Sequence, residues 1–152
     1  MKIKLYLPIL VLAFALTLYG CKKNNPAPAS KSELIIGKWS IQADTSRQYI
    51  NGVVQSTYVV RGINSPYYQF NADRTGTMKD NIGTPDLPAT FTYTVSNDTV
   101  VMNVPKQASY QYGDVTTYKI VKLSSNAMIL LWEDNSPVPG DSSYKEYIYL
   151  SK

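Results

Sequence analysis

From Gly37 onward, short runs of β-forming residues alternate with turn signals at fairly even spacing, and this pattern constrains the fold most strongly. No window in this region repeats apolar residues at the helical period for long enough to form a helix. Several short strands separated by regular turns are typical of a β-barrel or a β-sandwich. We therefore expect an all-β fold, an antiparallel up-and-down meander of about eight to nine strands.

Three two-residue turn signals predict hairpins in this meander. Asn51-Gly52, Asn97-Asp98 and Ser125-Asn126 each separate two β-rich runs. Pairing across Asn97-Asp98 makes one face apolar and leaves the other mostly polar, as expected for strands that cover a core. The apolar face holds Phe91, Tyr93, Val95, Val100, Met102 and Val104.

The hairpin around Ser125-Asn126 differs because apolar residues occupy both of its faces. If residues alternate strictly between the two faces, one face holds Val121, Leu123, Met128, Leu130 and Trp132. The opposite face takes Tyr118, Ile120, Ile129 and Leu131. This arrangement indicates that another segment or a partner covers the outer side. In the Asn51-Gly52 hairpin, apolar and polar residues are only weakly separated between the two faces. This pattern favours a hairpin that protrudes as a rim or lid.

The beginning of the chain has the order of a secretory signal peptide. Lys2 and Lys4 precede an apolar stretch from Leu5 to Tyr19, which is followed by Gly20 and Cys21. The stretch is shorter than the roughly 20 residues that a membrane-spanning helix needs. An ordinary signal peptide, or a membrane helix that contains a cysteine, is the alternative.

Leu18-Tyr19-Gly20-Cys21 resembles the lipobox of bacterial lipoproteins. In that class the chain is cut before the cysteine, whose thiol is acylated, so the resemblance implies a membrane anchor at Cys21. Lys22 in the next position, instead of aspartate, implies the outer membrane of a Gram-negative cell envelope. We expect residues 1–20 to be a signal peptide, 21–33 a lipidated N-terminus and flexible tether, and 34–152 the folded domain.

The composition excludes several kinds of catalytic site. The chain has no histidine and a single cysteine, which removes Ser-His-Asp and Cys-His catalysis and histidine metal sites. Asp44 and Glu146 are too isolated in sequence to propose as a catalytic pair. Glu133-Asp134-Asn135 with Asp141 indicates a solvated turn in preference to a cation site. We expect a protein with no catalytic residue, no cofactor and no metal.

The charge balance gives no sign of a nucleic-acid partner. Loss of Lys2 and Lys4 with the signal peptide leaves 13 of the 15 lysines and arginines, against 11 acidic residues. The basic residues are scattered instead of clustered. The expected partners are therefore the membrane, through the lipid anchor, and a ligand or macromolecule that the charge pattern does not identify.

Gly37-Lys38-Trp39 resembles the Gly-X-Trp signature that opens the first strand of lipocalins and lipocalin-like domains. In that family the tryptophan packs across the closed end of the barrel, beneath a short helical turn. Ser30 and Glu33 have capping-box spacing and predict such a turn immediately before the signature.

The resemblance extends to the later strands and to the cover of the tryptophan. Phe70–Thr77, Phe91–Val95 and Tyr118–Ser124 are similar to segments of small lipocalin-like lipoproteins of Bacteroidetes. Lipocalins also place a late arginine over the tryptophan. Arg74 is the last arginine here, so lysines such as Lys145 and Lys152 remain to cover Trp39.

The resemblance implies a closed lipocalin-like barrel, with a β-sandwich as the alternative fold. A barrel of about eight strands is either filled by its own side chains or holds one small ligand. We expect a small apolar or amphipathic ligand, with these candidate contacts: Phe91, Tyr93, Met102, Leu130 and Trp132. The alternative is a surface module that docks a protein or glycan, through the two-sided hairpin or through an outward strip of Tyr147 and Tyr149.

Replacing Cys21 with serine should release the protein from membranes. Serine has no thiol to acylate, and each buried methylene of an acyl chain contributes ~0.8 kcal/mol to anchoring. Cell fractionation and labelling with a fatty-acid analogue measure the effect. A variant that stays in the membrane fraction and takes up the label unchanged would contradict the anchor.

Overall fold

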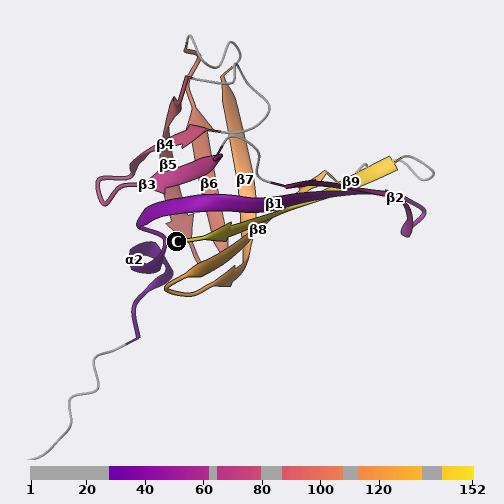
Figure 1. The fold of residues 1–152 in the computed structure, drawn as a ribbon, viewed down its shortest axis with the longest axis horizontal. Helices are drawn as coiled ribbons and strands as arrows, with labels where there is room; N and C mark the ends of the chain where they lie inside the picture. The colour runs from indigo at the N-terminus through magenta and orange to yellow at the C-terminus, as the bar shows by residue number, and fades with distance from the viewer. Residues whose placement is uncertain (1–27, 62–64, 80–86, 108–112, 135–141) are drawn as a thin grey trace, which may run out of the picture.

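The computed structural model describes residues 28–61, 65–79, 87–107, 113–134 and 142–152. Within these ranges the chain forms one short helix and nine strands (Figure 1). The elements are α2 (Lys31–Leu34), β1 (Gly37–Ile50), β2 (Val53–Arg61), β3 (Tyr67–Phe70), β4 (Thr75–Lys79), β5 (Ala89–Ser96), β6 (Thr99–Val104), β7 (Asp114–Leu123), β8 (Ala127–Asp134) and β9 (Ser142–Ser151). Cys21 lies outside the described residues.

The strands form a single antiparallel sheet that closes into a barrel. Their order is β2-β1-β3-β4-β5-β6-β7-β8-β9, and β1 also pairs with β9. That last pairing joins eight strands into a closed barrel and leaves β2 as an additional strand. The predicted all-β meander is confirmed, and closure through β1 and β9 rules out the β-sandwich.

β1 belongs both to the barrel and to a structure that projects from it. Gly37 to Ser40 pairs with β3, whereas Ala43 to Ile50 pairs with β2 along the same edge. β9 follows the other edge of β1 from Ser40 to Ile50. The outer parts of β1 and β9, with β2, form a three-stranded projection that we call the extension (Figure 1).

The tip of the extension is the predicted Asn51-Gly52 hairpin. Asn51 has φ of 51° and Gly52 has φ of 76°, the left-handed backbone that a two-residue type I′ turn requires at both positions. The hairpin protrudes, as expected, because β1 and β9 continue beyond the barrel and β2 pairs with β1 alone.

Trp39 and the short helix close one end of the barrel. Trp39 is fully buried, and its indole Nε1 donates a hydrogen bond to the carbonyl oxygen of Ile35 at 2.6 Å. Ile35 is also fully buried and belongs to the same core cluster. The backbone N–H of Ser30 donates to the Glu33 carboxylate at 2.8 Å, which confirms the predicted start of the helical turn.

Lys152 covers this closed end from outside. Its Nζ lies 4.4 Å from the centroid of the Trp39 ring and donates to the carbonyl oxygens of Leu34 at 3.0 Å and Ile36 at 2.7 Å. The ammonium group thus combines a cation–π contact with hydrogen bonds to carbonyls at the end of α2. Gly37 permits this approach, since its φ is +125° and a Cβ there would lie 3.1 Å from Lys152 Cε.

A β-bulge in β7 changes which residues of the β7–β8 hairpin share a face, relative to the prediction from the sequence. The register shifts between Ile120 and Lys122, so that Ile120 pairs with Leu130. Ile120 is 5% exposed and lies in the core, whereas Val121 is 49% exposed. The prediction that grouped Val121 with Leu130 on one face, and Ile120 with Leu131 on the other, is wrong because the inserted residue reverses the alternation.

Among the described residues, the strand pairings lie between Gly37 and Ser151, and α2 with Ile35 supplies the cover of the closed end. Residues 22–152 include all of these contacts. No helix in the described part of the chain is long and apolar enough to cross a membrane.

Lys152→Met should lower the free energy of unfolding by about 1–2 kcal/mol, because it removes the cation–π contact and two charged hydrogen bonds at a solvent-exposed site. Lys152→Arg should lose much less, since a guanidinium also stacks and donates. Denaturant unfolding followed by circular dichroism measures both, with Lys119→Met on an exposed position of β7 as control. A wild-type midpoint for Lys152→Met would contradict the stabilising role.

Candidate functional site

A cavity of about 370 Å³ occupies the part of the barrel away from Trp39. It is lined by residues of β1, β2 and β3, by the later residues of β4, β6 and β8, by the first half of β7 and by the middle of β9. Most of the wall is apolar or aromatic, and its main members are Ile41, Tyr68, Met78, Met102, Trp132 and Ile148. The barrel is therefore filled at the closed end and hollow toward the other.

The five predicted ligand-contact residues divide between these two regions. Met102 and Trp132 line the cavity. Phe91, Tyr93 and Leu130 are at most 2% exposed and belong to the packed core instead. A ligand contact for Met102 and Trp132 stays a prediction, and the other three side chains lie in the filled part of the barrel.

Edge-to-face aromatic packing fills the region near the closed end. The ring centroid of Phe70 lies 5.4 Å from that of Phe91 and 5.0 Å from that of Tyr93. The Tyr93 hydroxyl donates to the carbonyl oxygen of Asn71 at 2.6 Å. Gly76 leaves room for this cluster, because a Cβ there would lie 2.3 Å from Phe91 Cζ. These contacts fill the interior of the barrel between its closed end and the cavity.

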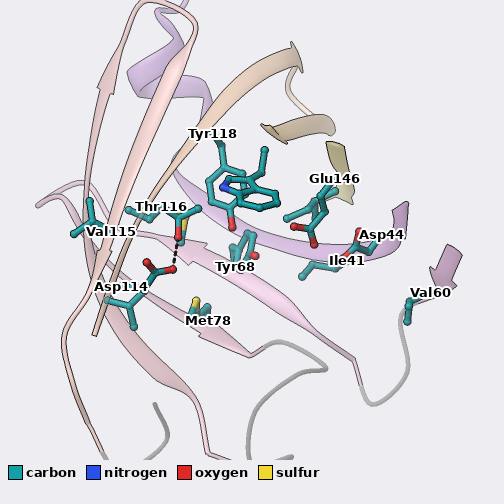
Figure 2. A pocket seen from close by; sticks show the side chains of 14 residues that line it. Ile41, Asp44, Val60, Tyr68, Met78, Asp114, Val115, Thr116, Tyr118 and Glu146 are labelled. Atoms are coloured by element: carbon teal, nitrogen blue, oxygen red, sulfur yellow. Dashed lines mark hydrogen bonds between the residues drawn. The ribbon is translucent and has the colours of Figure 1, made fainter. Parts of the chain in front are cut away.

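The cavity wall brings together two carboxyl groups that are far apart in sequence. Asp44 pairs with Ile148, and Ser46 pairs with Glu146, along the β1–β9 ladder. Asp44 and Glu146 are therefore diagonal neighbours on the inner face of adjacent strands. Figure 2 shows the two side chains on the same side of the cavity. Their isolation in the sequence concealed this pairing.

A β-bulge at Gln42 turns Asp44 into the barrel. The register of β1 against β9 shifts between Ile41 and Ala43. Trp39 is buried and Ile41 lines the cavity, so strict alternation would place Ala43 inside and Asp44 outside. The bulge reverses that order. Simple alternation of faces, counted from Trp39, therefore assigns Asp44 to the wrong face of β1.

The environment of Glu146 favours its protonated form. Burial, followed by interaction with the neighbouring Asp44 carboxyl group, raises the pKa of Glu146 to about 8. Glu146 therefore holds a proton at neutral pH, which its carboxyl group donates to Asp44 in a side-chain hydrogen bond. When both groups are ionised, the buried Oδ1 of Asp44 has no hydrogen-bond partner within the described residues.

Cations close to this pair in sequence lie on the outer face. Lys145 Nζ is 2.5 Å from Glu133 Oε1, and the guanidinium of Arg47 lies 5.5 Å from the centroid of the Tyr147 ring. The described residues that line the cavity include neither lysine nor arginine. Asp114 adds a third carboxyl group on β7, where it accepts a hydrogen bond from Thr116 Oγ1 at 2.7 Å (Figure 2).

The predicted tyrosine strip lies on the outside of the barrel. Ile148 and Leu150 are each 3% exposed and belong to the core, so Tyr147 and Tyr149 lie on the opposite face of β9. Both tyrosines are half-buried. The most exposed apolar side chains of the extension are instead on β2: Val53, Val54, Tyr58 and Val59.

The acidic residues weighed as a cation site are only partly described. Glu133 and Asp134 end β8, and Asn135 and Asp141 lie outside the described residues. Glu133 pairs with Lys145. Within the described ranges, no group of three or more Asp, Glu, His or Cys residues is placed to hold a metal ion.

Comparison with known proteins gives a family match and one distant structural likeness. A family model described as a lipocalin-like domain matches residues 35–130, more than half of the chain. No curated protein matches the sequence. The 2.60 Å crystal structure of an uncharacterized protein from Bacteroides eggerthii DSM 20697 is similar over 77% of this chain and 98% of that chain, with 16% identity and a TM-score of 0.43.

The raised pKa of Glu146 predicts that stability falls as pH rises from about 4.5 to about 8. Within this window the folded protein keeps a proton that the unfolded chain, with an ordinary pKa of 4.5, has lost. The expected loss is about 1–2 kcal/mol, because water screens part of the carboxyl group. Denaturant unfolding across the window measures it.

Glu146→Gln should remove this part of the pH dependence, since the amide does not titrate. Glu133→Gln, on the outer face of the neighbouring strand, is the matched control and should keep the wild-type slope. A wild-type slope in Glu146→Gln would show that another group is responsible.

Proposed function

Because the chain belongs to the lipocalin-like domain family, we propose that it is a non-catalytic lipoprotein that binds one small apolar or amphipathic molecule in its barrel. The cavity of about 370 Å³ is the observation that carries this proposal. Its volume lies within the range of known small-molecule sites, and its apolar wall includes a few polar groups, as such sites do.

The contrast between the two parts of the barrel supports a binding role. Close packing of Phe70, Phe91 and Tyr93 fills the part near Trp39, as in an ordinary protein interior. The part lined by Met102 and Trp132 is hollow. An unfilled apolar space costs stability. A barrel that acts only as a scaffold has no need of such a space.

The position of α2 indicates which end of the barrel the proposed anchor would hold. The described chain enters the barrel through Ser30 and α2, at the end that Trp39 and Lys152 close. An anchor at Cys21 would attach the domain to the outer membrane by this end. The cavity would then lie toward the side away from the bilayer, where it can exchange ligand with the surrounding medium.

A surface-docking module is the second candidate, and the extension favours it. β2 is an edge strand that is exposed along most of its length, with Tyr58 69% exposed and Val53 62% exposed. Such an edge can pair with a strand of another protein, and exposed tyrosines suit protein or glycan surfaces. This function requires no ligand in the barrel.

Native mass spectrometry of residues 22–152, expressed in the protein's own type of host, should show a discrete additional mass that is lost on activation. The mass identifies the chemical class of the ligand. A bare mass, with no uptake from a lipid extract of the same host, would contradict the binding proposal and favour the docking module.

The two tryptophans provide an internal check on where a ligand binds. Trp132 lines the cavity, whereas Trp39 is fully buried at the closed end. Ligand uptake should therefore change the emission of Trp132 alone, and Trp132→Phe should remove the change while mass spectrometry still detects binding. A change that persists in Trp132→Phe would place the ligand outside the cavity.

A further inference from the structure

The charge inside the cavity identifies a class of ligand, provided that the cavity binds one as proposed above. Asp44, Asp114 and Glu146 contribute carboxyl groups, and no described lining residue is cationic. Tyr68 and Tyr118 are the other titratable groups in the wall, and both are polar aromatics. The polar part of the wall therefore attracts cations and repels anions.

The two carboxyl groups on β1 and β9 are placed to receive a charged head group. Both side chains face the hollow part of the barrel from adjacent strands (Figure 2). When Glu146 is ionised it no longer donates to Asp44, and the buried Oδ1 of Asp44 is left without a partner among the described residues, although buried polar atoms are nearly always hydrogen-bonded in folded proteins. A donor on a bound molecule would supply the missing bond.

The rest of the wall suits an apolar body attached to that head group. Met78, Met102 and Ile148 provide aliphatic and thioether surface, while Tyr68 and Trp132 provide aromatic rings. Aromatic faces also stabilise a nearby ammonium group. The cavity therefore combines an acidic region with an apolar one.

We propose that the cavity binds an amphipathic organic cation, a protonated amine on an apolar body, whose ammonium group lies against Asp44 and Glu146. A fatty acid of similar size is disfavoured, because its carboxylate would face like charges in a partly desolvated space. A neutral alcohol would fill the apolar region without gaining a charge pair.

Protonation of Glu146 makes this binding depend on pH. Its pKa of about 8 means that the carboxyl group is largely neutral at pH 7. An ammonium ion favours the ionised form, so binding at pH 7 should release a proton from Glu146. The affinity for the amine should therefore rise as pH increases toward 8 and then level off, until the amine itself loses its proton.

Octylamine, 1-octanol and octanoic acid test the proposal because they share one alkyl chain and differ in head group. Binding to residues 22–152 is measured by titration calorimetry and by Trp132 fluorescence, near pH 6 and near pH 8.5. We expect octylamine to bind about tenfold more tightly than 1-octanol at the higher pH, and octanoic acid to bind least. Only the amine should show a pH-dependent affinity.

Three variants assign the effect to the carboxyl pair. Asp44→Asn combined with Glu146→Gln should remove the preference for the amine over 1-octanol. Glu146→Gln alone should abolish proton release, which calorimetry in two buffers of different ionisation enthalpy detects. Glu133→Gln, on the outer face, should behave as wild type.

The outcomes separate the two proposals. Equal binding of amine and alcohol, tighter binding of the acid, or an amine preference that survives the double substitution would overturn the cationic ligand and leave the binding function intact. Failure of all three probes to bind would overturn both. Preferential binding of the amine that depends on Asp44 and Glu146 would support both.

Discussion

The closed barrel depends on the pairing of β1 with β9, and the contact of Lys152 with Trp39 stabilises one end of that pairing. Trp39 stands on β1, and Lys152 follows β9, so the contact joins the two strands whose pairing closes the sheet. The same ammonium group binds carbonyl oxygens at the end of α2, while the Trp39 indole binds Ile35. The helix, the first strand and the last strand thus meet at one place, where these groups satisfy the carbonyl oxygens of Leu34, Ile35 and Ile36. Sealing this end leaves the other end for the cavity.

Two β-bulges set the chemistry of the interior. The bulge at Gln42 brings Asp44 to the inner face of β1, and the bulge at Val121 brings Ile120 and Tyr118 to the inner face of β7. Each inserts a single residue and reverses the alternation on one side of itself. Without the first bulge the neutral side chain of Ala43 would occupy the position next to Glu146. The acidic character of the cavity is therefore a product of backbone irregularity as much as of composition.

Most of the fold could be predicted because its signals are local. The turns at Asn51-Gly52 and Asn97-Asp98, the helical turn begun by Ser30, and the buried Trp39 each depend on a few neighbouring residues. The candidate site was less predictable. Asp44 and Glu146 are neighbours only because β1 pairs with β9. The alternation of apolar and polar residues in the sequence does not show where a β-bulge occurs. Phe91, Tyr93 and Leu130 were expected at the ligand, but inward orientation alone does not reveal how far the interior is filled.

The sharing of β1 between barrel and extension has a mechanical consequence. Asp44 pairs with Val60 of β2 on one side and with Ile148 of β9 on the other, so it stands where the extension leaves the barrel. From Ala43 to Ile50, β1 is hydrogen-bonded along both edges, to β2 and to β9, which restrains its backbone where it leaves the barrel. The base of the extension is also the rim of the cavity, because Asp44 and Val60 both line it. One continuous strand therefore belongs to both structures, and the Asp44 carboxyl group lies where they meet.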